Sequence, residues 1–238
     1  MSKYEGLVLP TEILIDVLLH VDPKEIKNMC ATNAMYSAIC SDEYFQKQYR
    51  KKWGVVTRKE VLPRLVQKYS KNGKTLQLNN KGIDSLVGFP EMDDLEHLFL
   101  DRNQISSLEG LPDLPKLDAL SLGSNKISSL EGFPQLKNLE TLSLNHNQLA
   151  SMKGLPVLSK LTELDVSENN LTSFKGLPEI RSGRLKLHIG YNQISSLEGL
   201  SALQYLESLE VSGDDLDNEI VDGIKRFCWE NAIECTFI

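Results

Sequence analysis

The chain has 238 residues, of which 41% are hydrophobic and 25% are charged, a balance typical of a soluble globular protein with one or two domains. No apolar run approaches the roughly 18 residues that a membrane-spanning helix requires, and the opening residues do not form a secretory signal, so we expect a cytoplasmic or nuclear protein without a membrane partner. The four cysteines form no C-x-x-C pair, which argues against a zinc or thioredoxin-like site and predicts reduced thiols.

The net charge of −7 is distributed unevenly along the chain. Residues 1–74 carry 13 basic and 8 acidic side chains, whereas residues 75–238 carry 13 and 25. An acidic surface repels the phosphates of nucleic acid, so we expect no nucleic-acid partner. The simplest explanation of the opposite charges is an attraction between the two parts of the chain.

Residues 1–54 predict a small all-α domain. Pro10 suits the first turn of a helix, and Asp22-Pro23-Lys24-Glu25 combines an N-cap, a proline and a carboxylate at the start of a second helix. Two further short helices are expected, one after Thr32 and one after Ser41 or Asp42.

These helices carry Leu9-Pro10-Thr11-Glu12-Ile13, Val17-Leu18, Asp22-Pro23-Lys24-Glu25-Ile26, Tyr36-Ser37-Ala38-Ile39 and Asp42-Glu43-Tyr44-Phe45. The series resembles an F-box, a trihelical module that docks onto the adaptor subunit of Skp–cullin–F-box ubiquitin ligases. It departs from the family pattern at Glu25-Ile26, at Asn33-Ala34-Met35, at Tyr36 and in lacking a tryptophan after Asp42. The resemblance implies an adaptor-binding set of Leu9, Pro10, Ile13, Val17, Leu18, Ile26 and Met29.

Residues 55–74 predict a linker or capping helix between this domain and the remainder of the chain. Thr57-Arg58-Lys59-Glu60 has the pattern of a capping box, and apolar residues follow it at helical spacing. Pro63 within this stripe indicates that the helix starts or kinks near that residue.

Residues 75–216 repeat a unit of about 22 residues. Equivalent positions are occupied by Asn103, Asn125, Asn147, Asn169, Asn192 and finally Asp214. A second series with the same period is Gly88, Gly110, Gly132, Gly154, Gly176 and Gly199. Two aliphatic residues separated by one residue, the first of them leucine, precede each asparagine, which predicts a short strand that ends in an asparagine turn. One unit cannot bury its leucines, but stacked units form a continuous core, so the period predicts a solenoid.

The pattern L-x-x-L-x-L-x-x-N-x-I-x-x-L-x-G-L-P-x-L resembles the leucine-rich repeat in its short form. The resemblance implies an α/β solenoid, a horseshoe of six or seven units with a parallel sheet. The Gly-Leu-Pro segment leaves few residues for the outer side, so we expect return segments that are 3₁₀ or extended. The first unit, with Lys81 in place of the asparagine, is degenerate, as terminal repeats commonly are.

Residues 217–238 predict a C-terminal cap. Apolar residues at helical spacing indicate a helix that begins after Asp217 or Asn218 and ends at Asn231. Residues 233–238 then predict a strand that joins the sheet as its last parallel member. Trp229 and Phe237 are expected to cover the end of the core.

The strand side chains that avoid the core should form columns on the concave face, because adjacent repeats lie about 4.8 Å apart. One column reads Gln77, Phe99, Ser121, Ser143, Asp165, His188 and Glu210, and the column before it reads Thr75, His97, Ala119, Thr141, Glu163, Lys186 and Ser208. The residues that we predict to bind a partner are His97, Phe99, Asp101, Arg102, Glu163, Asp165, Glu168, Lys186, His188, Tyr191 and Glu210. Phe99 is the candidate anchor, and the acidic last third favours a basic protein segment.

The sequence predicts neither an enzyme nor a cofactor or metal site. Ser143, Asp165 and His188 have the composition of a catalytic triad, but Asp165 occupies the central strand, where a triad requires the histidine. His97 and His188 are four repeats apart, about 19 Å at the usual strand spacing, which is too far for one metal ion.

The two resemblances together imply a substrate receptor that joins an unidentified protein substrate to a Skp-type adaptor, and that is a monomer outside its complex. The alternative is a leucine-rich repeat scaffold in which residues 1–54 are a structural cap. The same repeat is similar to that of regulatory subunits of type-one protein phosphatase, which also bind through the concave face.

Overall fold

The structure, a computed structural model, describes residues 65–67, 69–70, 73–177, 184–212 and 216–238. The predicted F-box-like domain with its adaptor-binding residues, the capping box at residues 57–60, and Asp214 lie outside the described residues. In the linker, residues 65–67 and Tyr69 are helical, and Val66 is buried in the core.

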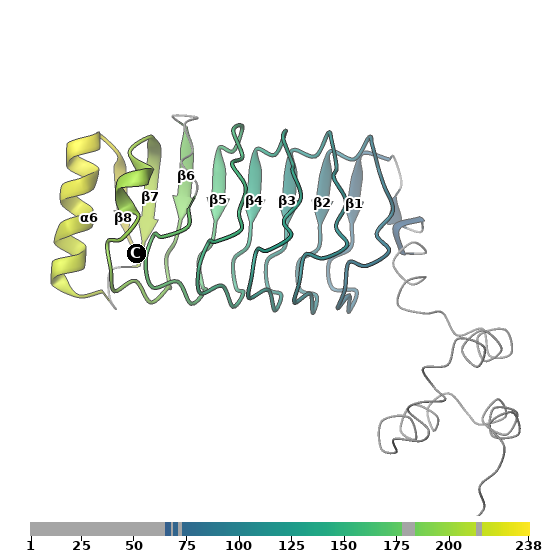
Figure 1. The fold of residues 1–238 in the computed structure, drawn as a ribbon, viewed down its shortest axis with the longest axis horizontal. Helices are drawn as coiled ribbons and strands as arrows, with labels where there is room; N and C mark the ends of the chain where they lie inside the picture. The colour runs from purple at the N-terminus through teal and green to yellow at the C-terminus, as the bar shows by residue number, and fades with distance from the viewer. Residues whose placement is uncertain (1–64, 68, 71–72, 178–183, 213–215) are drawn as a thin grey trace, which may run out of the picture. The chain divides into compact units, whose positions relative to one another are not determined.

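Eight parallel strands follow one another in chain order and form one open sheet (Figure 1). They are β1 (Thr75–Gln77), β2 (His97–Phe99), β3 (Ala119–Ser121), β4 (Thr141–Ser143), β5 (Glu163–Asp165), β6 (Leu185–His188), β7 (Leu206–Val211) and β8 (Glu234–Phe237). In β1 to β5 the central leucine is buried and its two neighbours are not, because successive side chains of a strand point to opposite faces.

The strand register agrees with the predicted columns. Leu76 pairs with Leu98, and the same leucine position continues from strand to strand as far as Leu209. The pairing of β6 with β7 has one irregularity, between Leu185 and Lys186. Because the central leucines align, all outward-pointing side chains also align, and the columns extend across the whole sheet.

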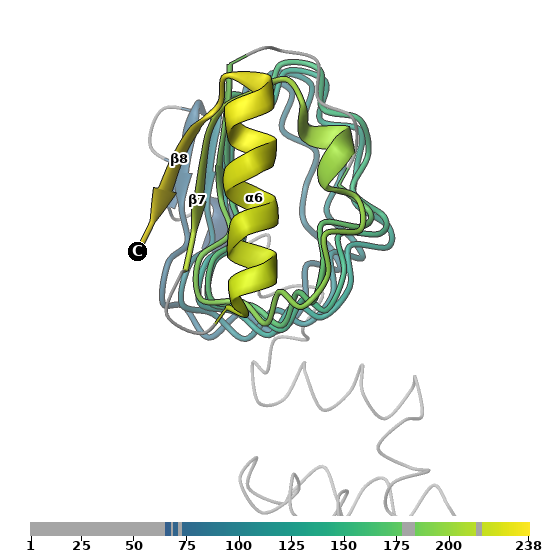
Figure 2. The same cartoon turned by 90° about the vertical axis from the view of Figure 1, so that its left-hand side faces the viewer.

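The core lies between the sheet and the return segments, as Figure 2 shows in a view along the solenoid. The prediction of 3₁₀ or extended return segments is confirmed, since the described ones contain turns, irregular backbone and a single 3₁₀ helix, η1 (Leu200–Leu203). Phe174 is the largest fully buried side chain of this core. Among the described residues there is no helix with the length and apolar character needed to cross a membrane.

Glycines of the second repeated series allow the return segments to stack closely. Gly154 has a φ of +99°, and a Cβ built on it would lie 2.8 Å from the carbonyl carbon of Leu130 in the preceding repeat. Gly199 has a φ of +90°, and its Cβ would lie 2.6 Å from the carbonyl carbon of Phe174. A side chain at either position would therefore separate two repeats and strain the backbone.

The C-terminal cap has the predicted elements. Helix α6 (Asn218–Asn231) begins after Asp217, whose side chain accepts a hydrogen bond from the Glu219 amide, and β8 pairs in parallel with β7. Trp229 was expected to cover the core, but this prediction is wrong, because the indole is 87% exposed. The buried residues Ile224 and Cys228 define the inner side of α6, and one residue beyond Cys228 the helix already faces solvent.

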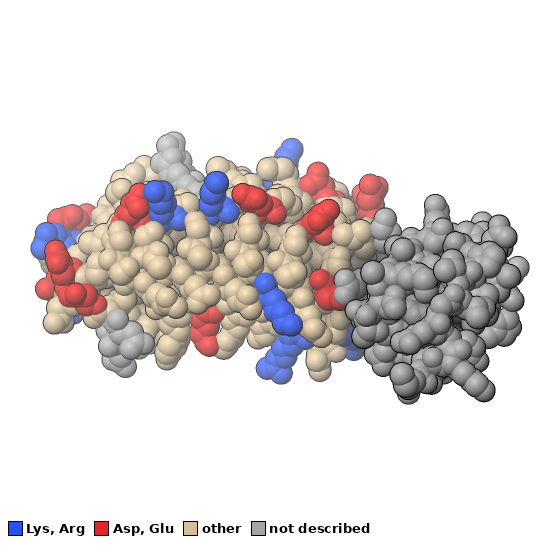
Figure 3. Space-filling view, turned by 60° about the horizontal axis from the view of Figure 1, so that its bottom comes forward, with Lys and Arg blue, Asp and Glu red and all other residues tan. Residues whose placement is uncertain are grey.

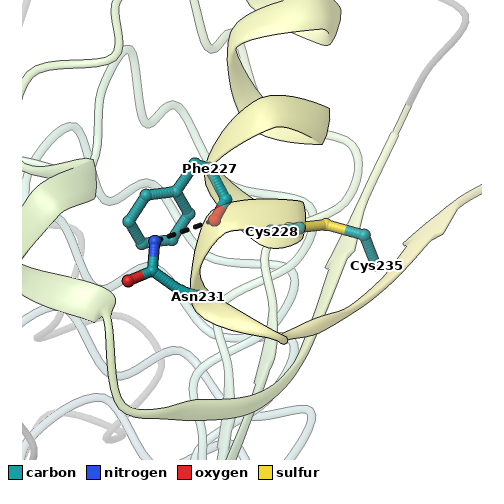
Figure 4. The surroundings of a disulfide bond; sticks show 4 residues. All are labelled: Phe227, Cys228, Asn231 and Cys235. Carbon is teal, nitrogen blue, oxygen red and sulfur yellow. Dashed lines mark hydrogen bonds between the residues drawn. A yellow bond between two sulfur atoms is a disulfide. The ribbon is translucent and has the colours of Figure 1, made fainter.

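A disulfide between Cys228 and Cys235 joins α6 to β8 (Figure 4). The predicted reduced state is therefore wrong for this pair, while Cys30 and Cys40 lie outside the described residues. The pairing follows from the turn after α6, which brings the start of β8 back alongside the last helical turn. In the same turn the Asn231 side chain donates a hydrogen bond of 2.8 Å to the Phe227 carbonyl.

Candidate functional site

The outward-pointing side chains of the strands form one surface, which we call the strand face. It consists of the two predicted columns together with Glu234 and Thr236 of β8. The structure places seven of the predicted partner-binding residues on this face, namely His97, Phe99, Glu163, Asp165, Lys186, His188 and Glu210. The face is chemically varied, whereas the core positions between its columns are almost uniformly leucine.

A second row of side chains runs beside the strand face, where each strand turns into the following segment. We call it the turn row, and its members are Asn80, Arg102, Ser124, His146, Glu168 and Tyr191. All six have φ values between 50° and 56°, a left-handed conformation that is unfavourable for most residues other than glycine and asparagine. The amide of Arg102, for example, donates to the Gly123 carbonyl at 2.9 Å, so each turn is fixed by the next repeat.

From Arg102 onward, an asparagine follows each turn-row residue and holds the turn in place, and four of these five asparagines, Asn103, Asn125, Asn147 and Asn169, are buried. Asn125 accepts a hydrogen bond from the Ile105 amide through Oδ1 and donates through Nδ2 to the carbonyls of Leu100 and Leu122. These bonds connect two consecutive repeats. The turn row is therefore held on a rigid base, which suits a recognition surface.

Two predicted site carboxylates are engaged by the scaffold. Asp101 accepts hydrogen bonds from the Ser121 hydroxyl and from the Gly123 amide, the latter at 2.8 Å. Asp165 accepts from both the amide and the hydroxyl of Ser167, at 3.0 and 2.6 Å. Both side chains help to fix turns, so their role on the surface is partly structural.

His97 connects three repeats, an arrangement that the sequence analysis missed. Its Nδ1 lies 3.1 Å from Oγ1 of Thr75 on β1, and its Nε2 lies 3.3 Å from Oδ1 of Asp118, just before β3. Within the described part of the chain, Asp118 Oδ1 is buried and accepts no well-aligned hydrogen bond. Nε2 of His97 therefore faces this oxygen at 3.3 Å, although the two atoms do not form a well-aligned hydrogen bond.

The two other described histidines also contact the following repeat. Nδ1 of His146 lies 2.6 Å from Oε2 of Glu168, and Nδ1 of His188 lies 3.4 Å from Oε2 of Glu210. In both pairs the residues are 22 positions apart, which is the repeat period. The period could have predicted these two contacts, whereas the pair of His97 with Asp118 breaks the spacing by one residue.

Exposed ion pairs that join adjacent repeats shift the pKa values of several of their members. Hydrogen bonding to Lys116, and then its charge, lower the pKa of Asp94, and the same contact raises the pKa of Lys116. A hydrogen bond from Lys74 lowers the pKa of Glu96, and one to Glu198 raises the pKa of Lys175. Such solvated ion pairs contribute little to stability. They are surface contacts between repeats and do not define a reactive centre.

The charges on the edge of the molecule at which the strands end are dispersed. Figure 3, which views the lower edge of Figure 1, shows acidic and basic side chains separated by wide uncharged areas. The strand face differs, because carboxylates predominate on β5 to β8.

The described residues contain no group of three histidine, cysteine or acidic side chains placed to hold a metal ion. Ser143, Asp165 and His188 lie on consecutive strands with Asp165 in the middle, as the sequence analysis expected. This order does not allow the histidine to accept a proton from the serine, so these residues do not constitute a triad.

Comparison with known proteins identifies the repeats. A family model described as leucine-rich repeats (two copies) matches residues 93–136, 115–157 and 137–179, and it indicates no catalytic family. These residues therefore form leucine-rich repeats, and such repeats are generally protein-binding scaffolds. No curated protein matches the chain.

The comparison with solved structures supports the solenoid fold through one domain with a TM-score above 0.5. The leucine-rich repeat domain of a Shigella effector is similar at 20% identity, with a TM-score of 0.52, over 82% of this chain and 96% of that one. Two internalins of Listeria monocytogenes, inlF and inlC2, are similar at 27% and 22% identity, both with a TM-score of 0.45. The alignments cover 56% and 68% of this chain, and 40% of the first internalin and 92% of the second.

Proposed function

We propose that the strand face and the turn row together bind a protein partner, with no chemistry performed by this chain. The observation that carries the proposal is the contrast between these exposed, varied side chains and the uniform leucine core that positions them. The turn row adds support, because it keeps bulky residues such as Arg102 and Tyr191 in a conformation that glycine would adopt at less cost.

The two ends of this surface favour different contacts. Phe99 on β2 is a partly exposed aromatic residue three positions before Arg102, and aromatic and arginine side chains are frequent anchors of interfaces. Glu163 on β5 is exposed, Glu210 lies on the strand face of β7, and Glu168 belongs to the turn row. We therefore infer a partner that presents a basic segment to β5 to β7.

A double variant, Phe99→Ala with Glu163→Lys, is expected to lose its partners while retaining the fold. Glu163 is preferred to Asp165 because the latter fixes its own turn. Proteins captured from lysate by wild type and variant should be compared by quantitative mass spectrometry, and the affinity of each partner found should fall at least tenfold, about 1.4 kcal/mol. The matched control is Glu131→Lys, on an exposed return segment. Partners that bind the double variant as tightly as the control would exclude the strand face.

We further propose that the partner is a substrate presented to a Skp–cullin–F-box-type ubiquitin ligase. The sequence resemblance of residues 9–45 to an F-box supports this function, with Leu9, Pro10, Ile13, Val17, Leu18, Ile26 and Met29 as the adaptor-binding side chains. The alternative is a scaffold or phosphatase-regulatory-type protein in which these helices cap the repeats.

The purified 238-residue chain is expected to co-purify with a Skp-type adaptor and to lose it on Pro10→Ala with Ile13→Asp. The substitutions remove two apolar contacts that the resemblance implies, and a buried carboxylate at an apolar interface is strongly unfavourable. Size-exclusion chromatography of the mixture provides the measurement, with the strand-face double variant as a control that should still bind. Failure of the intact chain to bind would favour the scaffold alternative.

A further inference from the structure

We propose that the outer edge of β8 binds an extended segment of a protein partner, which joins the sheet as a ninth strand. The order of strands ends at β8, and among the described residues β8 pairs with β7 alone. The other end of the sheet differs, because Ser70 forms an antiparallel bridge with Leu76 of β1. The inference goes beyond the proposed function, since it concerns main-chain pairing at one end of the sheet.

The backbone of β8 directs two residues at this edge. The Ile238 amide donates to the Val211 carbonyl at 2.9 Å, so Ile238 bonds toward β7. In a parallel pair every second residue bonds to the same neighbour. The N–H and C=O groups of Cys235 and Phe237 therefore point away from β7, and such a row of groups is a template for another extended backbone.

Helix α6 forms a wall beside the edge and leaves it open. Nζ of Lys225 lies 5.3 Å from the centre of the Phe237 ring, and Cys228 is joined to Cys235, so this side of α6 faces β8. Trp229 lies one helical turn after Lys225 and is 87% exposed, which places the indole beside the space for a ninth strand. Figure 2, which looks onto this end of the sheet, shows β8 beside α6 and not behind it.

The position of α6 favours a single segment over a second copy of the chain. Figure 1 shows α6 beyond β8 at the end of the row of strands, and Figure 2 shows it on the side of the core. A second copy that paired its own β8 with this edge about a two-fold axis would keep both helices on the same side of the continued sheet. The two α6 helices would then overlap, whereas an isolated strand brings no helix with it.

The side chains around the edge indicate which segment fits. On the strand face, Glu234 is exposed at the end of one column, and Glu210 lies beside Thr236 in the other. A ninth strand about 4.8 Å away would place a side chain next to the Glu234 carboxylate, which favours lysine or arginine. Alternate side chains would meet Phe237 and Trp229, which favours β-branched or aromatic residues. The edge therefore suits an extended segment in which basic and apolar residues alternate.

The probe is a fluorescein-labelled peptide of alternating lysine and valine residues, measured by fluorescence anisotropy with the 238-residue chain. Two further peptides carry backbone N-methyl groups on the lysines only or on the valines only. Because only alternate N–H groups of an added strand face β8, one methylated peptide should bind within about threefold of the parent, and the other at least about tenfold more weakly. Failure of the parent peptide to bind, or equal affinities of the two methylated peptides, would overturn the inference.

Two substitutions locate the bound peptide. Glu234→Lys should weaken binding about tenfold to twentyfold at low ionic strength, because an attraction worth roughly fourfold at about 5 Å in water becomes a repulsion of the same size. Trp229→Ala should weaken it about threefold to tenfold. The matched controls Glu131→Lys and Val157→Ala, on exposed return segments, should bind as wild type does. Losses in the controls as large as those at Glu234 and Trp229 would overturn the inference.

Two further measurements separate this edge from the strand face. The variant Phe99→Ala with Glu163→Lys should bind the peptide as wild type does, and a loss as large as that of Glu234→Lys would place the peptide on the strand face instead. Hydrogen exchange measured by NMR should slow at least about tenfold at the Cys235 and Phe237 amides when the peptide is bound. Protection confined to other strands would overturn the inference, whatever the outcome for the proposed function.

Discussion

Replacement of Asn169 by alanine is expected to destabilise the protein by about 3–5 kcal/mol, since it leaves at least two buried backbone groups without partners. Oδ1 of Asn169 accepts a hydrogen bond of 2.9 Å from the Leu149 amide, and Nδ2 donates to the carbonyl of Leu144 at 3.0 Å. Nδ2 also donates to the carbonyls of Val166 and Ser167. The free energy of unfolding from urea titration provides the measurement.

Asn170→Ala is the matched control, because it removes the same side chain one position later from an exposed site. Its amide oxygen accepts one exposed hydrogen bond of 3.3 Å from Gln193, so its removal should change the free energy of unfolding by less than about 0.5 kcal/mol. Similar losses for the two variants would show that the buried asparagines are not what holds consecutive turns together.

Gly154→Ala is expected to lower the free energy of unfolding by roughly 2–4 kcal/mol. A left-handed alanine costs about 1–2 kcal/mol, and the forced separation of two packed repeats adds a comparable amount. The new Cβ would lie 2.8 Å from both the carbonyl carbon and the carbonyl oxygen of Leu130, and backbone atoms cannot move aside as a flexible side chain can. Thermal and urea denaturation of the variant provide the measurement.

Gly132→Ala separates the two contributions. Gly132 has a similar φ of +81°, but a Cβ there would meet nothing within 4 Å. This variant should therefore show the conformational cost alone, about 1–2 kcal/mol. Equal destabilisation at the two glycines would contradict a role for close stacking at Gly154.

The repeat period made most of the fold predictable. Residues of one class recur about every 22 positions, and this period determines which residues of neighbouring strands pair. The columns from Thr75 to Ser208 could therefore be predicted from the sequence alone. The cap was predictable for a different reason, because the repeat pattern ends where helical spacing begins, after Asp217.

The details of the surface were less predictable because they depend on backbone angles and rotamers. The left-handed turns at Arg102 and Glu168 occur in residues that carry no glycine signal. The contact of His97 with Asp118 depends on how two side chains turn, which spacing does not determine. We expected Trp229 to be buried because it is apolar. Its position around the axis of α6 instead places it on the exposed side of the helix.

The chain-order stacking of β1 to β8 also has a consequence for assembly. Every strand pairs with the one encoded about one repeat away, so no distant segments must meet before native contacts form. Low contact order of this kind favours rapid, zipper-like growth from any nucleus. The length of the solenoid can therefore change by whole units, and loss or duplication of one 22-residue block would alter the area offered to partners without a new fold.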